Sequence, residues 1–215
     1  MKIAKGGLSW IISSILVNLF IIILTFYVNK IFYLYVYFLL ILSLLITIVL
    51  FIFFRDPERN IGNNVVAVAD GKIREISNEF DKEVGECTKI STFMNIHNVH
   101  VNRMPIDGKI KDIVHYNGKH IPAFKKESGN NERVKILIEA NNKIFKIVLI
   151  AGIVARRIVP YINKDETVKK GDRISIIRLG SRVDVFLPKK IIKSVNVKLN
   201  DKIKAGEDTI AEIND

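Results

Sequence analysis

The fold class is decided by residues 65–73, which read VVAVADGKI. An apolar run leads into an Asp-Gly pair, and a lysine and an isoleucine follow it. Apolar residues in short alternating runs, broken by Asp, Asn or Gly, are typical of β-strands joined by tight turns. Residues 134–138, VKILI, show the same alternation. We therefore expect a mainly β structure in residues 55–215, where no stretch predicts a long amphipathic helix.

Two pairs of segments in this region resemble each other. ADGKI at 69–73 is echoed by IDGKI at 106–110, and KGDRI at 170–174 is echoed by AGEDTI at 205–210. A short strand, a glycine turn and another short strand, used several times, predict a compact barrel or sandwich built from quasi-repeats. Asp-Gly turns are common, so the echoes alone say little about function.

The chain before this β region has a different character. The protein has 215 residues and a net charge of +11, yet its first 54 residues hold three lysines and no acidic residue. Two uncharged stretches of 24 residues, 6–29 and 31–54, flank a single lysine. Each would span about 36 Å as a helix, against a hydrocarbon core of roughly 30 Å. We expect a membrane anchor in residues 1–54, a hairpin of helices at about 7–29 and 31–54 that either spans the bilayer or enters it and returns.

Flanking charges predict which side of the membrane the rest of the chain occupies. Lys2, Lys5, Arg55 and Arg59 lie at the two ends of the hairpin and outnumber Lys30 at its tip. The positive-inside rule then places residues 55–215 on the cytoplasmic side of the cell membrane. A single cysteine permits no internal disulfide, which fits a reducing compartment. A wholly soluble protein and a polytopic transporter are both excluded by this pattern.

Residues 55–215 carry a net charge of +8. The lysines are scattered through strand-like segments without interleaved aromatic residues, which argues against nucleic acid as a partner. For a chain with a membrane anchor, anionic lipid headgroups are a simpler explanation, and solvated strand faces account for most individual lysines.

Few residues in the sequence predict catalysis when taken singly. The chain has no Walker loop, no His-Glu-x-x-His, no Cys-x-x-Cys and no Gly-x-Ser-x-Gly. His97 and His100 are three residues apart, but with one cysteine in the chain they do not predict a metal site. Ser181 follows Gly180 between two strand-like runs. Alone, it reads as a turn serine, His100 as a buried histidine and Asp70 as a turn residue.

These residues belong to an ordered set of segments that runs along most of the chain. The set comprises FFRDPER at 53–59, ADG at 69–71, FMN at 93–95, HVNRMP at 100–105, NER at 131–133, GIVARRIV at 152–159, KGDR at 170–173 and IRLGSRVD at 177–184. Together they resemble the phosphatidylserine decarboxylase family in its short form. The ordered set is far more specific than any one segment. Archaeal counterparts in this family act on archaetidylserine, the ether-lipid analogue.

The resemblance implies a proenzyme that makes its own cofactor. The Ser181 hydroxyl attacks the carbonyl of Gly180, the chain is cut between the two residues, and the serine is converted into a pyruvoyl group. The products are a β chain of residues 1–180 and an α chain of residues 181–215. The pyruvoyl ketone forms a Schiff base with the amine of a membrane serine phospholipid and accepts electrons as carbon dioxide leaves. Neither a metal nor pyridoxal phosphate is implied.

The resemblance also assigns the activation of Ser181 to a histidine backed by an aspartate, which correspond to His100 and Asp70. His100 is likewise the candidate for the residue that protonates the product carbanion. Longer family members have a second histidine three residues after the first, where this chain has Arg103. Either His100 has both roles or His97 takes one. We prefer His100, because it stands in the short-form His-x-Asn-Arg pattern.

Four arginines in family-like segments are candidates to bind the substrate phosphate: Arg103, Arg133, Arg156 and Arg157. The planar guanidinium group suits phosphate oxygens, although each arginine could equally stabilise the barrel.

The family fold is similar to the barrel-sandwich hybrid of biotinyl and lipoyl carriers, which agrees with the quasi-repeats. The alternative function is therefore a membrane-anchored hybrid-domain module that binds partners and catalyses nothing. A biotinyl or lipoyl carrier would need an acceptor lysine at a hairpin tip, and a secretion adaptor would need long heptad repeats. Neither feature is visible in the sequence. The sequence leaves the oligomeric state open.

Overall fold

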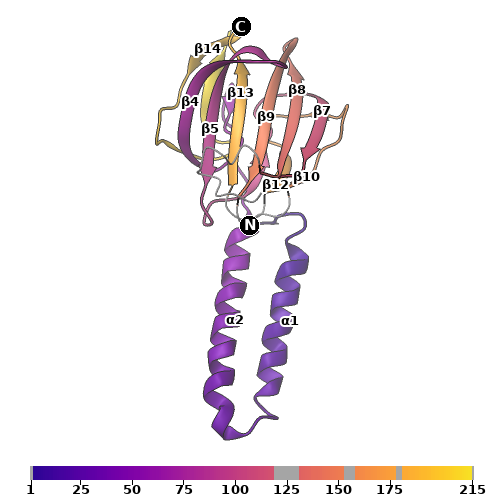
Figure 1. Ribbon diagram of the computed structural model, residues 1–215, viewed down its shortest axis with the longest axis vertical. Helices are drawn as coiled ribbons and strands as arrows, with labels where there is room; N and C mark the ends of the chain where they lie inside the picture. The colour runs from indigo at the N-terminus through magenta and orange to yellow at the C-terminus, as the bar shows by residue number, and fades with distance from the viewer. Residues whose placement is uncertain (1, 119–130, 153–157, 178–180, 215) are drawn as a thin grey trace. The chain divides into compact units, whose positions relative to one another are not determined.

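The computed structural model describes residues 2–118, 131–152, 158–177 and 181–214. The chain divides into two compact units, Met1–Glu58 and Arg59–Asp215. In chain order, the first unit contains β1 (Lys2–Ile3), α1 (Leu8–Leu24), the 3-10 helix η1 (Lys30–Phe32), α2 (Tyr33–Phe53) and β2 (Arg55–Asp56) (Figure 1).

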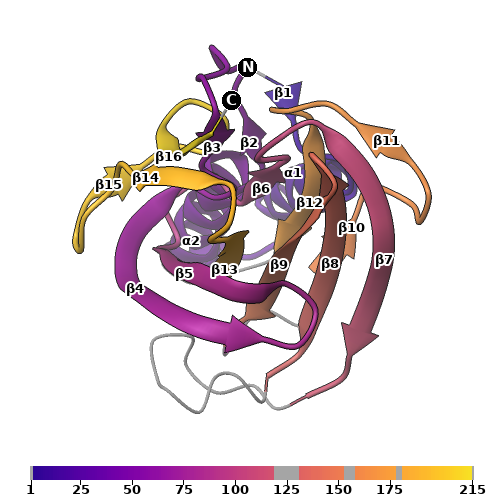
Figure 2. The same ribbon diagram turned by 90° about the horizontal axis from the view of Figure 1, so that it is seen from above.

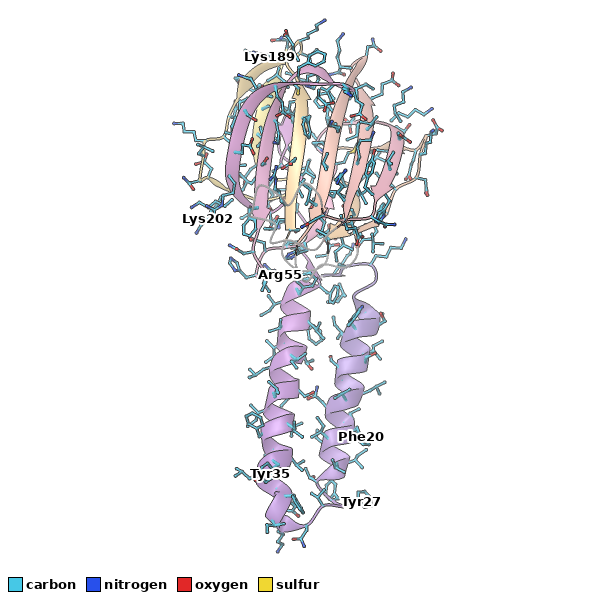
Figure 3. All side chains as sticks on the ribbon, viewed as in Figure 1. Phe20, Tyr27, Tyr35, Arg55, Lys189 and Lys202 are labelled. Carbon is cyan, nitrogen blue, oxygen red and sulfur yellow. The ribbon has the colours of Figure 1, made fainter. Side chains whose placement is uncertain are left out.

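The two helices of the first unit are apolar around most of their surface. Phe20 of α1 and Tyr35 of α2 project outward and are 65% and 66% exposed, and Tyr27, in the turn after α1, is 81% exposed (Figure 3). The run Lys30–Phe53, which comprises η1 and α2, contains an 18-residue window with a mean hydropathy of 3.0 and is long and apolar enough to cross a membrane. Helix α1 has 17 residues, which corresponds to about 26 Å and falls short of the roughly 30 Å hydrocarbon core.

The first helix is thus shorter than the predicted 7–29. It ends at Leu24, and the chain turns before the second helix begins. Asn29 has extended backbone angles and its side chain accepts a hydrogen bond from the Ile31 amide, so it is the N-cap of η1. An N-cap residue is non-helical, so Asn29 begins the next element and cannot be the last residue of the first helix.

The helices contact each other through a polar pair as well as through apolar side chains. The Asn18 amide donates to the Thr47 hydroxyl across 2.8 Å, and both side chains are buried. At the other end of the helices, β1 and β2 form a short antiparallel pair. The first unit is therefore a helical hairpin whose two ends are joined by backbone hydrogen bonds.

The second unit is built from strands. They are β3 (Val65–Val66), β4 (Gly71–Asp81), β5 (Gly85–Met94), β6 (Val101–Arg103), β7 (Gly108–Tyr116), β8 (Arg133–Ala140), β9 (Lys143–Ala151), β10 (Ile158–Pro160), β11 (Thr167–Val168), β12 (Arg173–Ile177), β13 (Ser181–Pro188), β14 (Ile192–Val195), β15 (Lys202–Ile203) and β16 (Thr209–Ile213). No helix occurs among the residues described after α2, so the prediction of a mainly β region is confirmed.

Eight strands form one sheet, in the order β11-β7-β8-β9-β13-β5-β4-β15, which curls into a half-barrel (Figure 2). Two smaller sheets, β10-β12-β6 and β14-β16-β3, complete the unit. Alternate residues of the large sheet, such as Val183, Leu149 and Ile136, are fully buried in one core. This is the period-two pattern that the sequence predicted for half-buried strands.

The echoed segments occupy equivalent places in the fold. Gly71 begins β4 and pairs with Ile203, while Gly108 begins β7 and pairs with Val168. The two later echoes are also equivalent: Gly171 and Gly206 have φ angles of +85° and +78°, a left-handed conformation that favours glycine.

The backbone contacts of these turns match as well. The Gly206 amide donates to the Ala67 carbonyl and the Gly171 amide donates to the Met104 carbonyl, each across 2.8 Å. The predicted quasi-repeat is therefore confirmed at the level of hydrogen bonds. One half contains Asp70 and the other contains Asp107.

Candidate functional site

Four strands begin or end at one level of the large sheet. Ser181, the first residue of β13, is paired with Met94 at the end of β5 and with Ala151 at the end of β9. Lys72 is paired with Phe93, so Gly71, one residue earlier, lies level with Met94. Met94 therefore has the Asp70–Gly71 turn on one side and Ser181, the start of β13, on the other.

Ser181 is fully buried. Among the described residues its hydroxyl contacts the sulfur of Met94, with 3.1 Å between Oγ and Sδ. A thioether sulfur is a weak acceptor, so this contact orients the hydroxyl without committing its proton strongly. Gly180 lies outside the described residues.

His100 is fully buried as well. Its carbonyl accepts a hydrogen bond from the Ile177 amide at the end of β12, four residues before Ser181. Its Nδ1 lies 2.9 Å from the carbonyl oxygen of Asn98. Because a carbonyl can only accept, this bond places the ring proton of the neutral imidazole on Nδ1 and leaves the basic lone pair on Nε2.

His97, the alternative to His100, lies in a different environment. It is exposed, in the turn between β5 and β6. That turn is closed by Asn98, whose amide donates to the Asn95 carbonyl and whose Oδ1 accepts from the Asn95 amide. The turn brings His100, rather than His97, back into the interior.

Asp70 is 7% exposed. Its Oδ1 accepts from the Ala205 amide at 2.8 Å, and Arg59 Nη2 lies 3.0 and 2.8 Å from its two oxygens. The side chain of Arg59 is 7% exposed and also contacts Glu207 at 3.2 Å. The sequence reading placed Arg59 at the membrane exit with the flanking charges; the structure corrects this, because its guanidinium lies between two carboxylates. Its position in the segment FRDPER was the available signal.

The backbone also brings Asp70 toward His100. The Val66 amide donates to the Pro105 carbonyl and the Arg103 amide donates to the Val68 carbonyl. The chain that leads to Asp70 is therefore hydrogen-bonded to the chain that follows His100.

The pKa of Glu207 is set by its place in the cluster of Arg59, Asp70 and Glu207. Burial opposes ionisation of its carboxyl, but the hydrogen bonds and charges of Arg59 and Lys204 together outweigh burial and lower the pKa of Glu207. The acid is therefore held as a carboxylate beside the arginine.

The arginines proposed for phosphate binding are placed differently from one another. Arg103 is 4% exposed and its Nη1 donates to the Gly171 carbonyl at 2.8 Å, a contact within the half of the repeat that contains Asp107. Arg133 is the first residue of β8 and is paired with Ile150 of β9, close to the edge that contains Ser181. The Cζ atom of its guanidinium lies 4.7 Å from the ring centre of Tyr116. Arg156 and Arg157 lie outside the described residues.

One polar residue at this edge was not singled out from the sequence. Asn131 is fully buried and its amide donates to the Ala151 carbonyl at 2.7 Å. Since Ala151 is paired with Ser181, Asn131 fixes the end of β9 beside the serine. Within the described ranges, no group of three or more His, Cys, Asp or Glu side chains is arranged to hold a metal ion.

Comparison with known proteins identifies the family of this arrangement. The family model described as phosphatidylserine decarboxylase matches residues 46–211. The chain belongs to this family. A relative of the phosphatidylserine decarboxylase family from Methanococcoides burtonii, provisionally named an archaetidylserine decarboxylase proenzyme, is 38% identical over 98% of this chain and 96% of its own.

Bacterial members are similarly close. The phosphatidylserine decarboxylase proenzyme of Syntrophus aciditrophicus is 41% identical over 72% of this chain and 75% of its own, and that of Streptomyces avermitilis is 44% identical over 72% and 69%. The predicted family resemblance is confirmed, and the matched region contains Ser181, His100 and Asp70.

Proposed function

We propose that this protein is a carboxy-lyase that removes carbon dioxide from the serine headgroup of a membrane phospholipid, leaving the ethanolamine phospholipid. Membership of the decarboxylase family carries this proposal, since relatives that cover nearly the whole chain or most of it are named as such enzymes. It also favours an enzyme over a non-catalytic hybrid-domain module.

The enzyme forms by self-cleavage between Gly180 and Ser181. The Ser181 oxygen attacks the Gly180 carbonyl carbon, the carbon–nitrogen bond breaks, and the nitrogen takes up a proton, which leaves an ester. Loss of the Ser181 α-proton then breaks the bond between Cβ and the ester oxygen. This step releases residues 1–180 with a carboxylate and leaves dehydroalanine on residues 181–215. Water replaces the nitrogen, ammonia leaves, and a pyruvoyl group remains.

His100 is the base for this reaction. A serine hydroxyl is a weak nucleophile until its proton is removed. The Asn98 carbonyl holds Nδ1 of His100, so Nε2 is the nitrogen that takes the proton. Asp70 stabilises the imidazolium that forms, in the manner of a buried aspartate next to a catalytic histidine.

The surroundings of Ser181 fit a pyruvoyl group. The residue is buried, starts a strand and is held on both sides by β5 and β9, so a new chain end there would stay in register. The pyruvoyl carbonyl supplies an electron sink for an amine substrate. His100 Nε2 would return a proton to the substrate carbon that has lost carbon dioxide. Arg133 remains a candidate for the substrate phosphate, and the other three arginines keep the same proposed role from the sequence alone.

The first unit is proposed to hold the enzyme at the bilayer that contains its substrate. The apolar run Lys30–Phe53 supports this, and Lys2, Lys5 and Arg55 favour a cytoplasmic location for the catalytic unit. The serine headgroup is common to diacyl and ether lipids, so both are substrates in this proposal.

Intact-mass measurement of the purified full chain tests the proposal. We expect two chains, the smaller beginning at a pyruvoyl group in place of Ser181, and release of carbon dioxide from serine phospholipid in mixed micelles. Ser181→Ala should remain a single chain, and His100→Ala and Asp70→Asn should slow cleavage. A single unmodified wild-type chain that is active would refute the mechanism. Normal cleavage in His100→Ala would move the base role to His97.

A further inference from the structure

We propose that Arg59 is the positioning residue of Asp70. We also propose that it links Asp70 to Glu207, which lies on the other side of the proposed cleavage site in the sequence. The inference rests on the proposed function, because Asp70 is the partner proposed for His100. Arg59 and Asp70 would belong to the β chain after cleavage, whereas Glu207 and Ala205 would belong to the α chain.

The contacts of Arg59 divide its guanidinium between two acids. Nη2 faces the Asp70 carboxylate at 2.8 and 3.0 Å, and Nη1 faces Glu207 at 3.2 Å. Its side chain is 7% exposed. A buried arginine that touches carboxylates with two different nitrogens fixes both in space, which a lysine ammonium cannot reproduce with one nitrogen.

The two halves of the quasi-repeat show which contact of Asp70 is common to both Asp-Gly turns and which is particular to Asp70. Asp70 Oδ1 accepts from the Ala205 amide at 2.8 Å, and in the other half Asp107 Oδ1 accepts from the Lys170 amide at 2.7 Å. The two bonds are equivalent, because each joins an Asp-Gly turn to the residue before a left-handed glycine. The bond to Ala205 is therefore part of the common scaffold.

The ion pair with Arg59 has no counterpart in the second half. Asp107 is exposed and forms no ion pair with any residue in the described part of the chain. Turn geometry alone thus does not require an arginine. Of the two aspartates, the added cation is present at Asp70, the proposed partner of His100, where a fixed carboxylate orientation would matter for catalysis.

Burial explains why the arginine needs both acids. Charged side chains that leave water must be paired, and removal of one member of a buried pair leaves an uncompensated charge. With Glu207 on one side and Asp70 on the other, Arg59 holds the carboxylate of Asp70 in one orientation. It does so before cleavage and after it.

Self-cleavage of the full chain, synthesised in a cell-free system with detergent micelles, tests the inference. The half-time of conversion from one chain to two is measured for wild type, Arg59→Ala and Arg59→Lys, with Asp70→Asn and Asp107→Asn as the matched pair of turn variants. We expect Arg59→Ala and Asp70→Asn to slow cleavage about tenfold or more, because small losses of orientation have large effects on rate. Asp107→Asn should stay within about twofold of wild type, since the asparagine Oδ1 still accepts the turn hydrogen bond from the Lys170 amide.

Rescue distinguishes positioning from general stability. Millimolar guanidinium ion added to uncleaved Arg59→Ala should restore part of its rate and leave Asp70→Asn unchanged. Arg59→Lys, which keeps the charge, should fold even if the alanine variant does not, and should cleave at an intermediate rate. Wild-type cleavage rates in Arg59→Lys, equal slowing in Asp107→Asn, or no rescue of a folded Arg59→Ala would each overturn the inference. Failure of the wild-type chain to cleave would instead overturn the proposed function.

Discussion

Gly71→Ala is the substitution that most directly probes the edge containing Ser181. A Cβ atom on Gly71 would lie 2.2 Å from the carbonyl oxygen of Phe93 and 2.9 Å from Cγ2 of Thr92. The oxygen belongs to the backbone of β5, so a side-chain rotation cannot relieve the contact. The end of β5 must move by most of an ångström, and Met94, which is paired with Ser181, must move with it.

Two magnitudes follow from this geometry. Overpacking of a well-packed interior costs about 1–3 kcal/mol, which for a chain of this size lowers the unfolding midpoint by roughly 2–12 °C. A displacement of about 1 Å at a reacting group costs up to about a hundredfold in rate. We therefore expect Gly71→Ala to fold, to be modestly less stable and to cleave about ten to a hundred times more slowly.

Gly108→Ala is the matched control. Gly108 occupies the equivalent position in the other half, and its Cβ would lie 2.7 Å from the Glu139 carbonyl oxygen, where no candidate catalytic residue is paired. Thermal unfolding in detergent and the time course of chain cleavage are measured for both variants. Similar destabilisation with slow cleavage only in Gly71→Ala supports the site. If Gly71→Ala cleaves at the wild-type rate, or if both variants are slowed equally, the reasoning is wrong.

Three further predictions concern other parts of the molecule. The hydrogen bond from Lys135 is the main cause that lowers the pKa of Glu83 below its ordinary value of 4.5, so the stability from this pair is present above pH 4.5 and is lost as the pH falls through the folded pKa. Glu83→Gln should lose about 0.2–1 kcal/mol at neutral pH and show a flatter decline of the unfolding midpoint in acid. Arg182 forms two 2.7 Å hydrogen bonds with the buried Asp184; Arg182→Met should cost about 3–5 kcal/mol in denaturant unfolding, whereas the double variant with Asp184→Leu should recover most of it. Asn18→Leu removes the hydrogen bond to the threonine of α2 and should cost about 0.6–2 kcal/mol in helix association, seen as weaker energy transfer between labels at the two helix ends; unchanged transfer would show that apolar packing alone holds the hairpin.

Local pattern predicted the strands of the second unit well, because burial of one sheet face imposes a period of two on the residues themselves. The glycine echoes were also readable, since a left-handed turn restricts which residue can occupy it. Helix bounds were less predictable: the first helix ends before Asn29, where capping competes with hydropathy.

The candidate site was only partly readable. Ser181, His100 and Asp70 are candidates because of their order along the chain and the family resemblance, not because of local chemistry. Arg59 was misjudged, because its position beside the apolar segment suggests a surface charge, and only the fold reveals that it is buried between Asp70 and Glu207.

The sequence by itself determined the division into an apolar front and a β unit, the repeated turns and the family, because each is written in neighbouring residues or in their order. Tertiary structure decided which strand ends meet at Ser181, which nitrogen of His100 is basic and which cation holds Asp70. These depend on pairing between residues as far apart as Arg59 and Glu207, and such pairings are set by sheet register and burial, which no local segment of sequence specifies.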